Sequence, residues 1–120
     1  MPPTRQSTAA LPLAPAVYLI LLALTDGDAH GYRIRAAVIE RSKGAVTLDP
    51  GSLYRLIARL SDDGLIGEAS RRPTRDENDE RRRYYRLTSL GRRLLEAETN
   101  RMAGLVAVAR RKSARGARPI

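Results

Sequence analysis

The chain has 120 residues, with no cysteine, phenylalanine or tryptophan, and its formal net charge is +9. This length fits one domain, and the lack of cysteine excludes disulfides, thiolate metal sites and a cysteine nucleophile. The excess of basic side chains favours a polyanionic partner such as nucleic acid. No stretch reaches the ~18 apolar residues of a membrane span. Residues 11–24 have no small-residue cleavage site after them, so we expect a cytoplasmic protein without a signal peptide.

The N-terminal quarter of the chain changes from polar to strongly apolar. Residues 1–10 contain prolines and hydroxyl side chains without periodicity, which predicts a disordered N-terminal arm. From about Pro15 to Thr25 the sequence is apolar nearly all round, which predicts a helix buried on more than one side. In so short a chain, this indicates contact with both the internal core and a partner subunit. A central helix of a monomer is the alternative.

A turn at residues 26–29 leads to a second predicted helix, which begins at His30-Gly31-Tyr32 and ends near Ser42. Its expected apolar positions are Tyr32, Ile34, Ala37, Val38 and Ile39. His30 is the only histidine, and it has no cysteine or second histidine with which to share a metal. We therefore interpret His30 as a helix N-cap or packing residue, not as a catalytic group.

The stretch from Asp49 to Asp63 predicts a short helix with both ends marked. Asp49 caps its N-terminus, Pro50 fits the first helical position, and Gly64 supplies the stop. One apolar stripe is formed by Leu53, Leu56, Ile57 and Leu60. The opposite face carries Ser52, Tyr54, Arg55, Ala58 and Arg59. These donors suit a nucleic-acid groove, although an ordinary amphipathic helix with a solvated basic face would look the same.

After Gly64 the pattern changes from helical to alternating. Residues 65–70 and 81–88 predict two short strands, joined by a charged connection over residues 71–80. Alternation puts Tyr85 and Leu87 on the buried face, and Arg82, Tyr84 and Arg86 on the other. This basic hairpin is a candidate second contact for the same duplex, or else merely a soluble hairpin.

The last predicted helix covers residues 89–109 and is capped by Thr88 or Ser89. A coiled-coil-like 3,4 spacing links Leu95, Glu98, Met102, Leu105 and Ala109. This helix has more apolar surface than the domain can cover, so we expect it to dimerise. Residues 110–120 predict a basic disordered tail that attracts nucleic acid non-specifically.

The order of elements predicts a mainly α fold with a small β-hairpin, that is, a winged helix-turn-helix domain (residues 11–88) with an appended C-terminal dimerisation helix. The third helix would enter the major groove of double-stranded DNA. The candidate base-reading residues are Ser52 and Arg55. The candidate DNA-backbone residues are Tyr54, Arg59, Arg71, Arg72, Arg75, Arg81, Arg82 and Arg83. The candidate dimerisation residues are Val17, Leu21, Leu94, Leu95, Met102 and Leu105. We expect no catalytic residues, no metal and no cofactor.

Four motifs in the same order resemble the PadR family of transcriptional regulators, in particular its compact subgroup with a single C-terminal helix. They are His30-Gly31-Tyr32, Gly51-Ser52-Leu53-Tyr54, the run from Arg59 to Ile66, and the run from Arg83 to Gly91. The resemblance implies a homodimeric DNA-binding regulator, usually a repressor, and some members are released from DNA by a small hydrophobic or phenolic effector. Arg55 stands where many relatives carry proline, and the tryptophan used by certain drug-binding relatives is absent.

The expected function is therefore sequence-specific regulation of transcription. Two alternatives stay open, a sequence-independent architectural DNA-binding protein and a winged-helix protein-interaction module. An enzyme is not expected, because the sequence contains no paired-carboxylate, phosphate-loop, metal or nucleophile arrangement.

Overall fold

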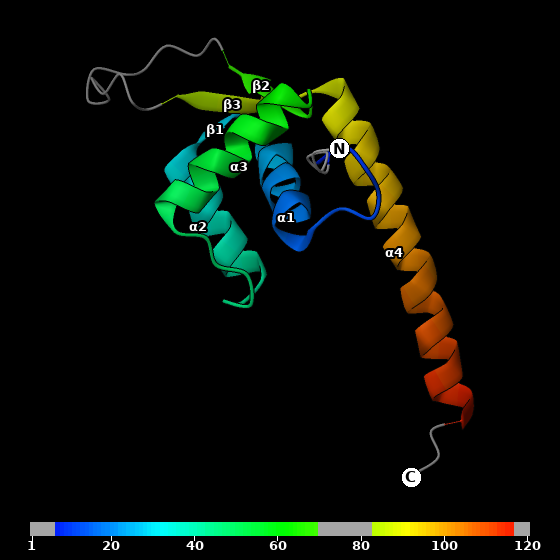
Figure 1. Cartoon of the computed structure of the whole chain (residues 1–120). Helices are drawn as coiled ribbons and strands as arrows, with labels where there is room; N and C mark the ends of the chain where they lie inside the picture. The colour runs from blue at the N-terminus through cyan, green and yellow to red at the C-terminus, as the bar shows by residue number, and fades with distance from the viewer. Residues whose placement is uncertain (1–6, 70–82, 117–120) are drawn as a thin grey trace, which may run out of the picture.

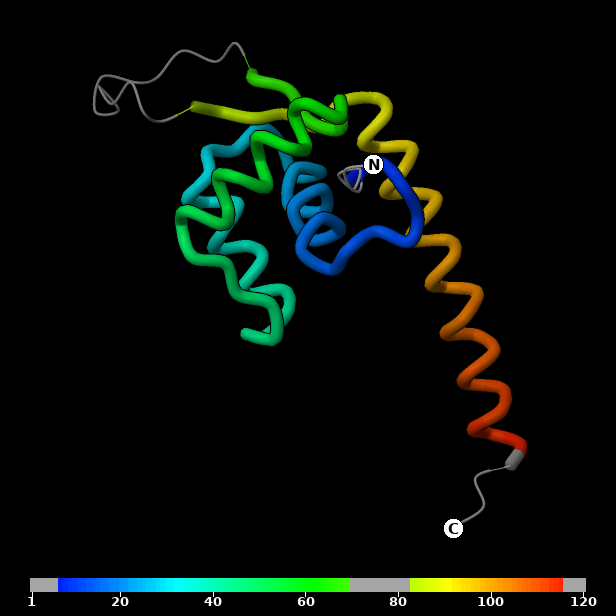
Figure 2. Tube along the Cα trace, viewed as in Figure 1, coloured from blue at the N-terminus to red at the C-terminus, as the bar shows by residue number. Residues whose placement is uncertain are grey.

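The computed structural model describes residues 7–69 and 83–116. It contains four helices, of which three pack around an aliphatic core and the fourth extends away from it (Figures 1 and 2). The helices are α1 (Pro15–Ala23), α2 (Gly31–Arg41), α3 (Pro50–Asp62) and α4 (Ser89–Gly116), with a 3₁₀ turn, η1 (Leu24–Asp26), after α1. Helices α1 to α3 form the body, and α4 leaves it and extends away (Figure 1). Within the described ranges, no helix combines the length and the apolar character needed to cross a bilayer.

A small antiparallel sheet covers one end of the helical body. Its strands are β1 (Ala29–His30), β2 (Ile66–Glu68) and β3 (Tyr84–Leu87), in the order β1-β3-β2. The sequence predicted only the β2–β3 hairpin, so β1 is an addition to that prediction. A two-residue strand shows no alternation, and β1 exists because Ala29 and His30 pair with Tyr85 and Tyr84.

The core is aliphatic, and each of the three body helices contributes a stripe to it. Ile20 and Leu21 of α1, Ile34 of α2, and Leu53 and Leu60 of α3 are all buried. In α3, Ile57 completes the predicted apolar stripe and is also buried, while Leu56 is half-buried. The predicted winged helix-turn-helix architecture is therefore confirmed, and α3 presents its other face outward.

Two tyrosines lie differently from the sequence expectation. Tyr32 was expected in the core, but 72% of it is exposed. The buried positions of α2 are Gly31, Ile34 and Val38, and Tyr32, two residues before Ile34, lies on the opposite side of the helix. Tyr84 was expected on the outer face of its strand, but it is buried, and the His30 ring lies edge-on to it at 5.6 Å because β1 pairs beside it.

The segment before α1 also differs from the prediction of a disordered arm over residues 1–10. Thr8 is buried, and both its backbone N–H (2.9 Å) and its hydroxyl donate to the Asp63 carboxylate. Further along, the Leu13 N–H donates to Glu98 at 2.7 Å. Through these hydrogen bonds, residues 7–14 hold the end of α3 and helix α4 together. Figure 2 shows this segment passing beside both elements before α1 begins. The rest of the predicted arm, residues 1–6, lies outside the described residues.

Helix α4 is longer than the predicted 89–109. Thr88 begins it as predicted, with its hydroxyl oxygen accepting the Gly91 N–H at 3.0 Å. The helix continues through Arg110 to Gly116, where a disordered tail was expected. Alanine, arginine and lysine are good helix formers, and the next proline after residue 110 is Pro119, so nothing in residues 110–115 ends the helix. Residues 117–120 lie outside the described part.

Candidate nucleic-acid interface

The first turn of α3 is organised by a chain of three side chains. Asp49 is the N-cap: its Oδ1 accepts the Ser52 N–H at 2.8 Å and its Oδ2 accepts the Ser52 hydroxyl at 3.1 Å. The Ser52 Oγ in turn accepts a hydrogen bond from the Arg55 guanidinium at 3.2 Å. The bonds from the Ser52 N–H and hydroxyl stabilise the anion and lower the pKa of Asp49 below its usual value. The predicted cap is confirmed, and it also positions Arg55.

Arg55 is an exposed cation at the beginning of a helix whose exposed face is otherwise nearly neutral. Gly51, Tyr54 and Ala58 are exposed beside it, and no acid intervenes until Asp62 at the end of α3. The first-turn geometry restrains Arg55, because its Nη2 is already bonded to Ser52. A restrained guanidinium loses less conformational entropy on binding a planar acceptor pair.

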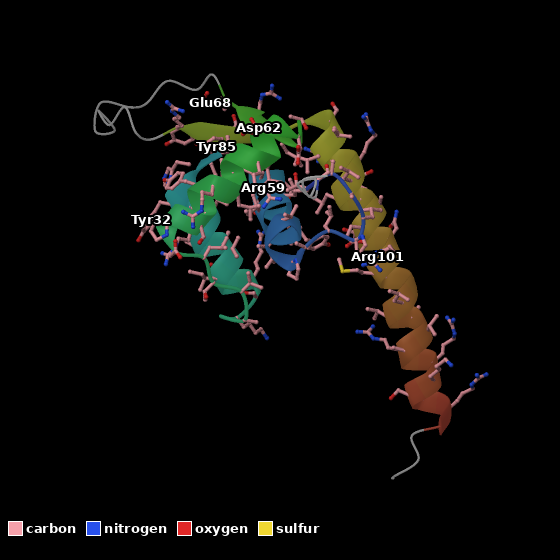
Figure 3. The ribbon with its side chains drawn as sticks, in the orientation of Figure 1. Tyr32, Arg59, Asp62, Glu68, Tyr85 and Arg101 are labelled. Carbon is pink, nitrogen blue, oxygen red and sulfur yellow. The ribbon has the colours of Figure 1, made fainter. Side chains whose placement is uncertain are left out.

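Tyr54 borders a groove of about 450 Å³ between α3 and the sheet. The groove is lined by Tyr54, Ile57, Ala58, Ser61, Asp62, Glu68, Arg83 and Tyr85. Figure 3 shows Asp62, Glu68 and Tyr85 on this side of α3. Tyr85 forms its floor, and burial raises the pKa of this phenol above its usual value. Tyr85 therefore stays protonated across the neutral range.

Arg83, immediately before β3, is paired within the same groove. Its Nε lies 3.5 Å from a Glu68 carboxylate oxygen, and both side chains are well exposed. Such an exposed pair contributes ~0–1 kcal/mol at most. Arg83 can therefore exchange Glu68 for another anion at little cost.

Arg59 lies on the other side of α3, toward the N-terminal segment. It is half-buried and lines a second groove, of about 550 Å³, together with Thr8, Leu56 and neighbouring residues of segment 7–17. This position separates it from Tyr54 and Arg83, which line the groove beside the sheet. The predicted backbone residues therefore occupy two different sides of α3.

Several predicted DNA residues cannot be placed. The wing arginines Arg71, Arg72, Arg75, Arg81 and Arg82 lie outside the described residues. The described interface consists of the first turn of α3, the groove beside the sheet, and Arg83. In this described part of the chain, His, Asp and Glu side chains form no cluster suited to a metal ion.

The six predicted dimerisation residues divide into two groups. Val17, Leu21 and Leu95 are buried in the core of the single chain, so little of their surface is left for a partner, and their predicted part in dimerisation stays a prediction. An apolar helix such as α1 is covered here by α2 and α4 of its own chain. Leu94 and Met102 are half-buried, and Leu105 is 58% exposed.

Sequence reasoning missed the structural part played by Gly31. A Cβ atom at this position would lie 2.7 Å from the Tyr54 hydroxyl oxygen, so α2 and α3 approach closely here. The helical period could have indicated that Gly31 is buried, since Gly31 shares a face of α2 with Ile34 and Val38. It also missed the second role of Asp49, whose spacing of three from Ser52 and six from Arg55 places all three on one side of the first turns.

Comparison with known proteins agrees with this architecture. The model of the PadR-like transcriptional regulator family matches residues 20–97. A 37.1 kDa protein in transposon TN4556 of Streptomyces fradiae is 46% identical over 90 residues, which are 75% of this chain and 24% of that protein. The chain thus spans about a quarter of the length of that relative.

Solved structures show the same fold. A PadR family transcription regulator from Clostridium difficile R20291 has a TM-score of 0.63 at 25% identity, covering 82% of this chain and 97% of that one. A PadR-like transcriptional regulator from Bacillus cereus has a TM-score of 0.63 at 22% identity, covering 83% and 91%. The chain therefore belongs to the PadR-like transcriptional regulator family.

Proposed function

We propose that this protein is a sequence-specific repressor that binds its operator as a homodimer, with α3 in the major groove. The observation that carries the proposal is the Asp49–Ser52–Arg55 chain at the exposed first turns of α3. Recognition helices of helix-turn-helix proteins read base edges with their N-terminal residues. A guanidinium held at that end is the group best suited to guanine O6 and N7.

The charge distribution along α3 supports this orientation. Arg55 lies near the N-terminal end, whereas Asp62 is exposed at the C-terminal end. The Asp49 carboxylate at the N-terminal end is already hydrogen-bonded to Ser52, whereas the Asp62 carboxylate would face phosphates directly, so the favourable approach brings the first half of α3 nearest the duplex. In the proposal Arg55 reads a guanine, a contact worth about 1–3 kcal/mol of discrimination. Ser52 orients Arg55 and contacts the neighbouring base.

The groove beside the sheet supplies contacts to the DNA backbone in this proposal. Tyr54 presents a phenol that is 47% exposed, and Arg83 presents a cation whose bond to Glu68 is weak. Phosphate contacts of this kind fix the position of a protein on DNA without reading its sequence. Arg59 is assigned to a phosphate on the opposite side of α3. In the proposal, the wing arginines outside the described residues make further contacts to DNA phosphates.

Pairing of two copies is supported by an apolar stripe on α4. Four side chains at helical spacing form this α4 stripe, namely Met102, Leu105, Val106 and Val108. Leu105, Val106 and Val108 are exposed large hydrophobic residues, and every described side chain from 103 to 115 is exposed. The part of α4 from residue 103 to 116 has no cover from its own chain, and an isolated helical segment of about that length is only marginally stable in water. A second α4 packed on the stripe would bury it and account for the helix.

A small hydrophobic effector is a further part of the proposal. A groove of about 470 Å³ lies between α1 and α4, lined in part by Tyr18, Leu22, Leu95 and Thr99. Its volume falls within the range of small-molecule sites, and its residues lie beside the α4 stripe. A ligand bound in this groove would change the position of α1 relative to α4. In a dimer, this shift would change the distance between the two α3 helices.

Competition binding tests the proposed function. A labelled duplex recovered by selection from random sequences is bound by the protein and displaced with bulk genomic DNA. A specific regulator should prefer the selected duplex by ~10³ or more. A ratio near one would instead identify an architectural DNA-binding protein, for which the exposed basic side chains Arg110, Arg111, Lys112 and Arg115 would suffice. Absence of duplex binding at moderate salt would identify a protein-interaction module.

A further inference from the structure

Tyr32 is the most exposed large hydrophobic side chain in the described chain, at 72%. It lies in the first turn of α2, on the side opposite Ile34 and Val38. The His30 ring lies nearby, with its centroid 6.5 Å from that of Tyr32 at a tilt of 37°. Packing in the core therefore does not account for a tyrosine here.

The position of Tyr32 relates it to the recognition helix. It directly follows Gly31, the residue at which α2 touches the Tyr54 phenol of α3. Figure 3 shows Tyr32 at the side of the molecule where α2 and α3 both begin. Arg101 of α4 is labelled on the opposite side, so Tyr32 is remote from the α4 stripe. Its surroundings are thus those of the candidate nucleic-acid interface and not of the dimer surface.

The phenol of Tyr32 indicates which kind of chemical group it can contact on a partner. A phenol carries one strong O–H donor on a rigid ring with few rotatable bonds. Arg33 is exposed next to it, and Arg55 is exposed at the first turns of α3, so positive charge borders this side of the molecule. The anionic group that approaches such a surface in a DNA complex is a phosphate, and tyrosine hydroxyls commonly donate to phosphate oxygens.

We propose that Tyr32 donates its hydroxyl to a phosphate of the duplex whose bases α3 reads. The contact rests on the proposed function and adds a residue from α2 to it. Tyr32 and Tyr54 then hold the backbone on the two sides of the α2–α3 junction. Because the phenol is neutral, the contact releases no counterion. Its loss weakens binding equally at every salt concentration, unlike the loss of an arginine–phosphate contact.

The test measures the affinity of Tyr32→Phe by fluorescence anisotropy on the selected duplex and on an unrelated duplex, over a series of salt concentrations. Affinity should fall about threefold to tenfold on both duplexes, as expected for one lost hydrogen bond. The slope of log K against log salt should not change. Arg83→Ala is the contrast, since it should change that slope by about one unit. Thermal unfolding of each variant checks that the fold is intact.

Ser113→Ala is the control. Ser113 is exposed near the C-terminal end of α4, which extends away from α2 and α3 (Figure 1), so removal of its hydroxyl should leave DNA affinity unchanged. Wild-type affinity for Tyr32→Phe on both duplexes would overturn the proposal. So would a loss confined to the selected duplex, which would mean a base contact, or a loss seen in Tyr32→Ala but not in Tyr32→Phe. If the wild-type protein binds neither duplex, the proposed function fails and this contact fails with it.

Discussion

Gly31 of α2 lies directly against the Tyr54 phenol of α3, with room for a hydrogen atom but not for a methyl group. A Cβ at Gly31 would stand 2.7 Å from the hydroxyl oxygen and 2.8 Å from the ring carbon Cε1 of Tyr54. Two motifs that are separate in sequence, His30-Gly31-Tyr32 and Gly51-Ser52-Leu53-Tyr54, therefore meet in space. The contact fixes the direction of a phenol on the exposed face of α3.

Substitution of Gly31 by alanine should affect DNA binding more than stability. The obstructing atoms belong to the outer end of an exposed side chain, so Tyr54 can rotate away at a cost of about 0.5–1.5 kcal/mol. The displaced hydroxyl then loses its proposed phosphate contact, and affinity should fall about threefold to tenfold on any duplex. Anisotropy and thermal unfolding measure the two effects.

Gly104→Ala is the control for this variant. Gly104 is in the exposed part of α4, where a Cβ meets nothing within 4 Å. Alanine there should raise stability by about 0.5–1 kcal/mol and leave DNA affinity unchanged. Unchanged affinity in Gly31→Ala would mean that the orientation of Tyr54 has no part in binding.

Gly91→Ala should be far more damaging to the fold. A Cβ at Gly91 would collide with the backbone carbonyl oxygen of Leu65, just before β2, and would lie 2.9 Å from a Leu87 methyl carbon. Backbone cannot rotate away as an exposed ring can, so the start of α4 must move from the sheet. We expect a loss of about 1–3 kcal/mol or more, measured by urea unfolding. A stability equal to the wild type would show that α4 does not approach the sheet this closely.

Glu98 is a buried carboxylate, only 1% exposed, that joins α4 to the segment before α1. The Arg101 guanidinium donates to it, as does the Leu13 N–H at 2.7 Å. These bonds hold the pKa of Glu98 below its usual value of 4.5. The sequence analysis counted Glu98 within the coiled-coil-like spacing of the last helix, where it is the polar member, whereas the structure shows its carboxylate accepting a backbone N–H from Leu13.

The stability of the protein should therefore depend on the charge of Glu98. A carboxyl group whose pKa is lower in the folded state stabilises the fold in full above its unfolded pKa of about 4.5. This contribution is lost as the pH falls through the lower, folded value. The wild type should be more stable than Glu98→Gln at neutral pH, and the difference should shrink below about pH 4.5. Urea midpoints over this range measure it.

Comparing the wild type with Glu98→Gln separates the effect of Glu98 on stability from the effects of the other acidic residues. Asp49 also has a lowered pKa, but it is present in both proteins and its effect cancels in the difference. A difference between wild type and Glu98→Gln that stays constant down to about pH 3 would contradict the charged bond to Leu13 and Arg101.

The elements that the sequence predicted correctly are those whose signals are local. Helix α3 is marked by a cap, a proline, an apolar period and a glycine within sixteen residues, from Asp49 to Gly64, and the structure confirms each of them. The N-cap role of His30 is also local, since Nδ1 accepts the Arg33 N–H at 3.2 Å. Signals of this kind depend only on residues that are close in sequence, so they can be read without knowing the tertiary contacts.

The errors arose where distant segments decide the outcome. Strand β1 forms only because β3, more than fifty residues later, pairs with it, and the same pairing buries Tyr84. Because α1 is apolar nearly all round, the sequence indicated both the internal core and a partner subunit for it, and its own chain already buries Val17 and Leu21. Periodicity shows that a side is buried, and it does not show which neighbour buries it.

Pairing through the α4 stripe is tested by Leu105→Glu. In a two-fold dimer the substitution acts twice, and burial of each leucine is worth about 1.5–3 kcal/mol. Association should weaken about a hundredfold or more, as measured by sedimentation velocity. Ala103→Glu, which adds the same charge on the opposite side of α4, should leave association unchanged. A wild-type protein that stays monomeric at high concentration would contradict the proposed homodimer.

The base-reading role of Arg55 is the central claim, and selection of bound duplexes from a random pool tests it most directly. The wild type should yield a palindromic consensus with half-sites one helical turn apart, ~10–10.5 base pairs centre to centre. Arg55→Ala, selected in parallel, should yield the same consensus except for a lost guanine preference at one position in each half-site. Identical consensus sequences from the two proteins, or no consensus from the wild type, would contradict the account.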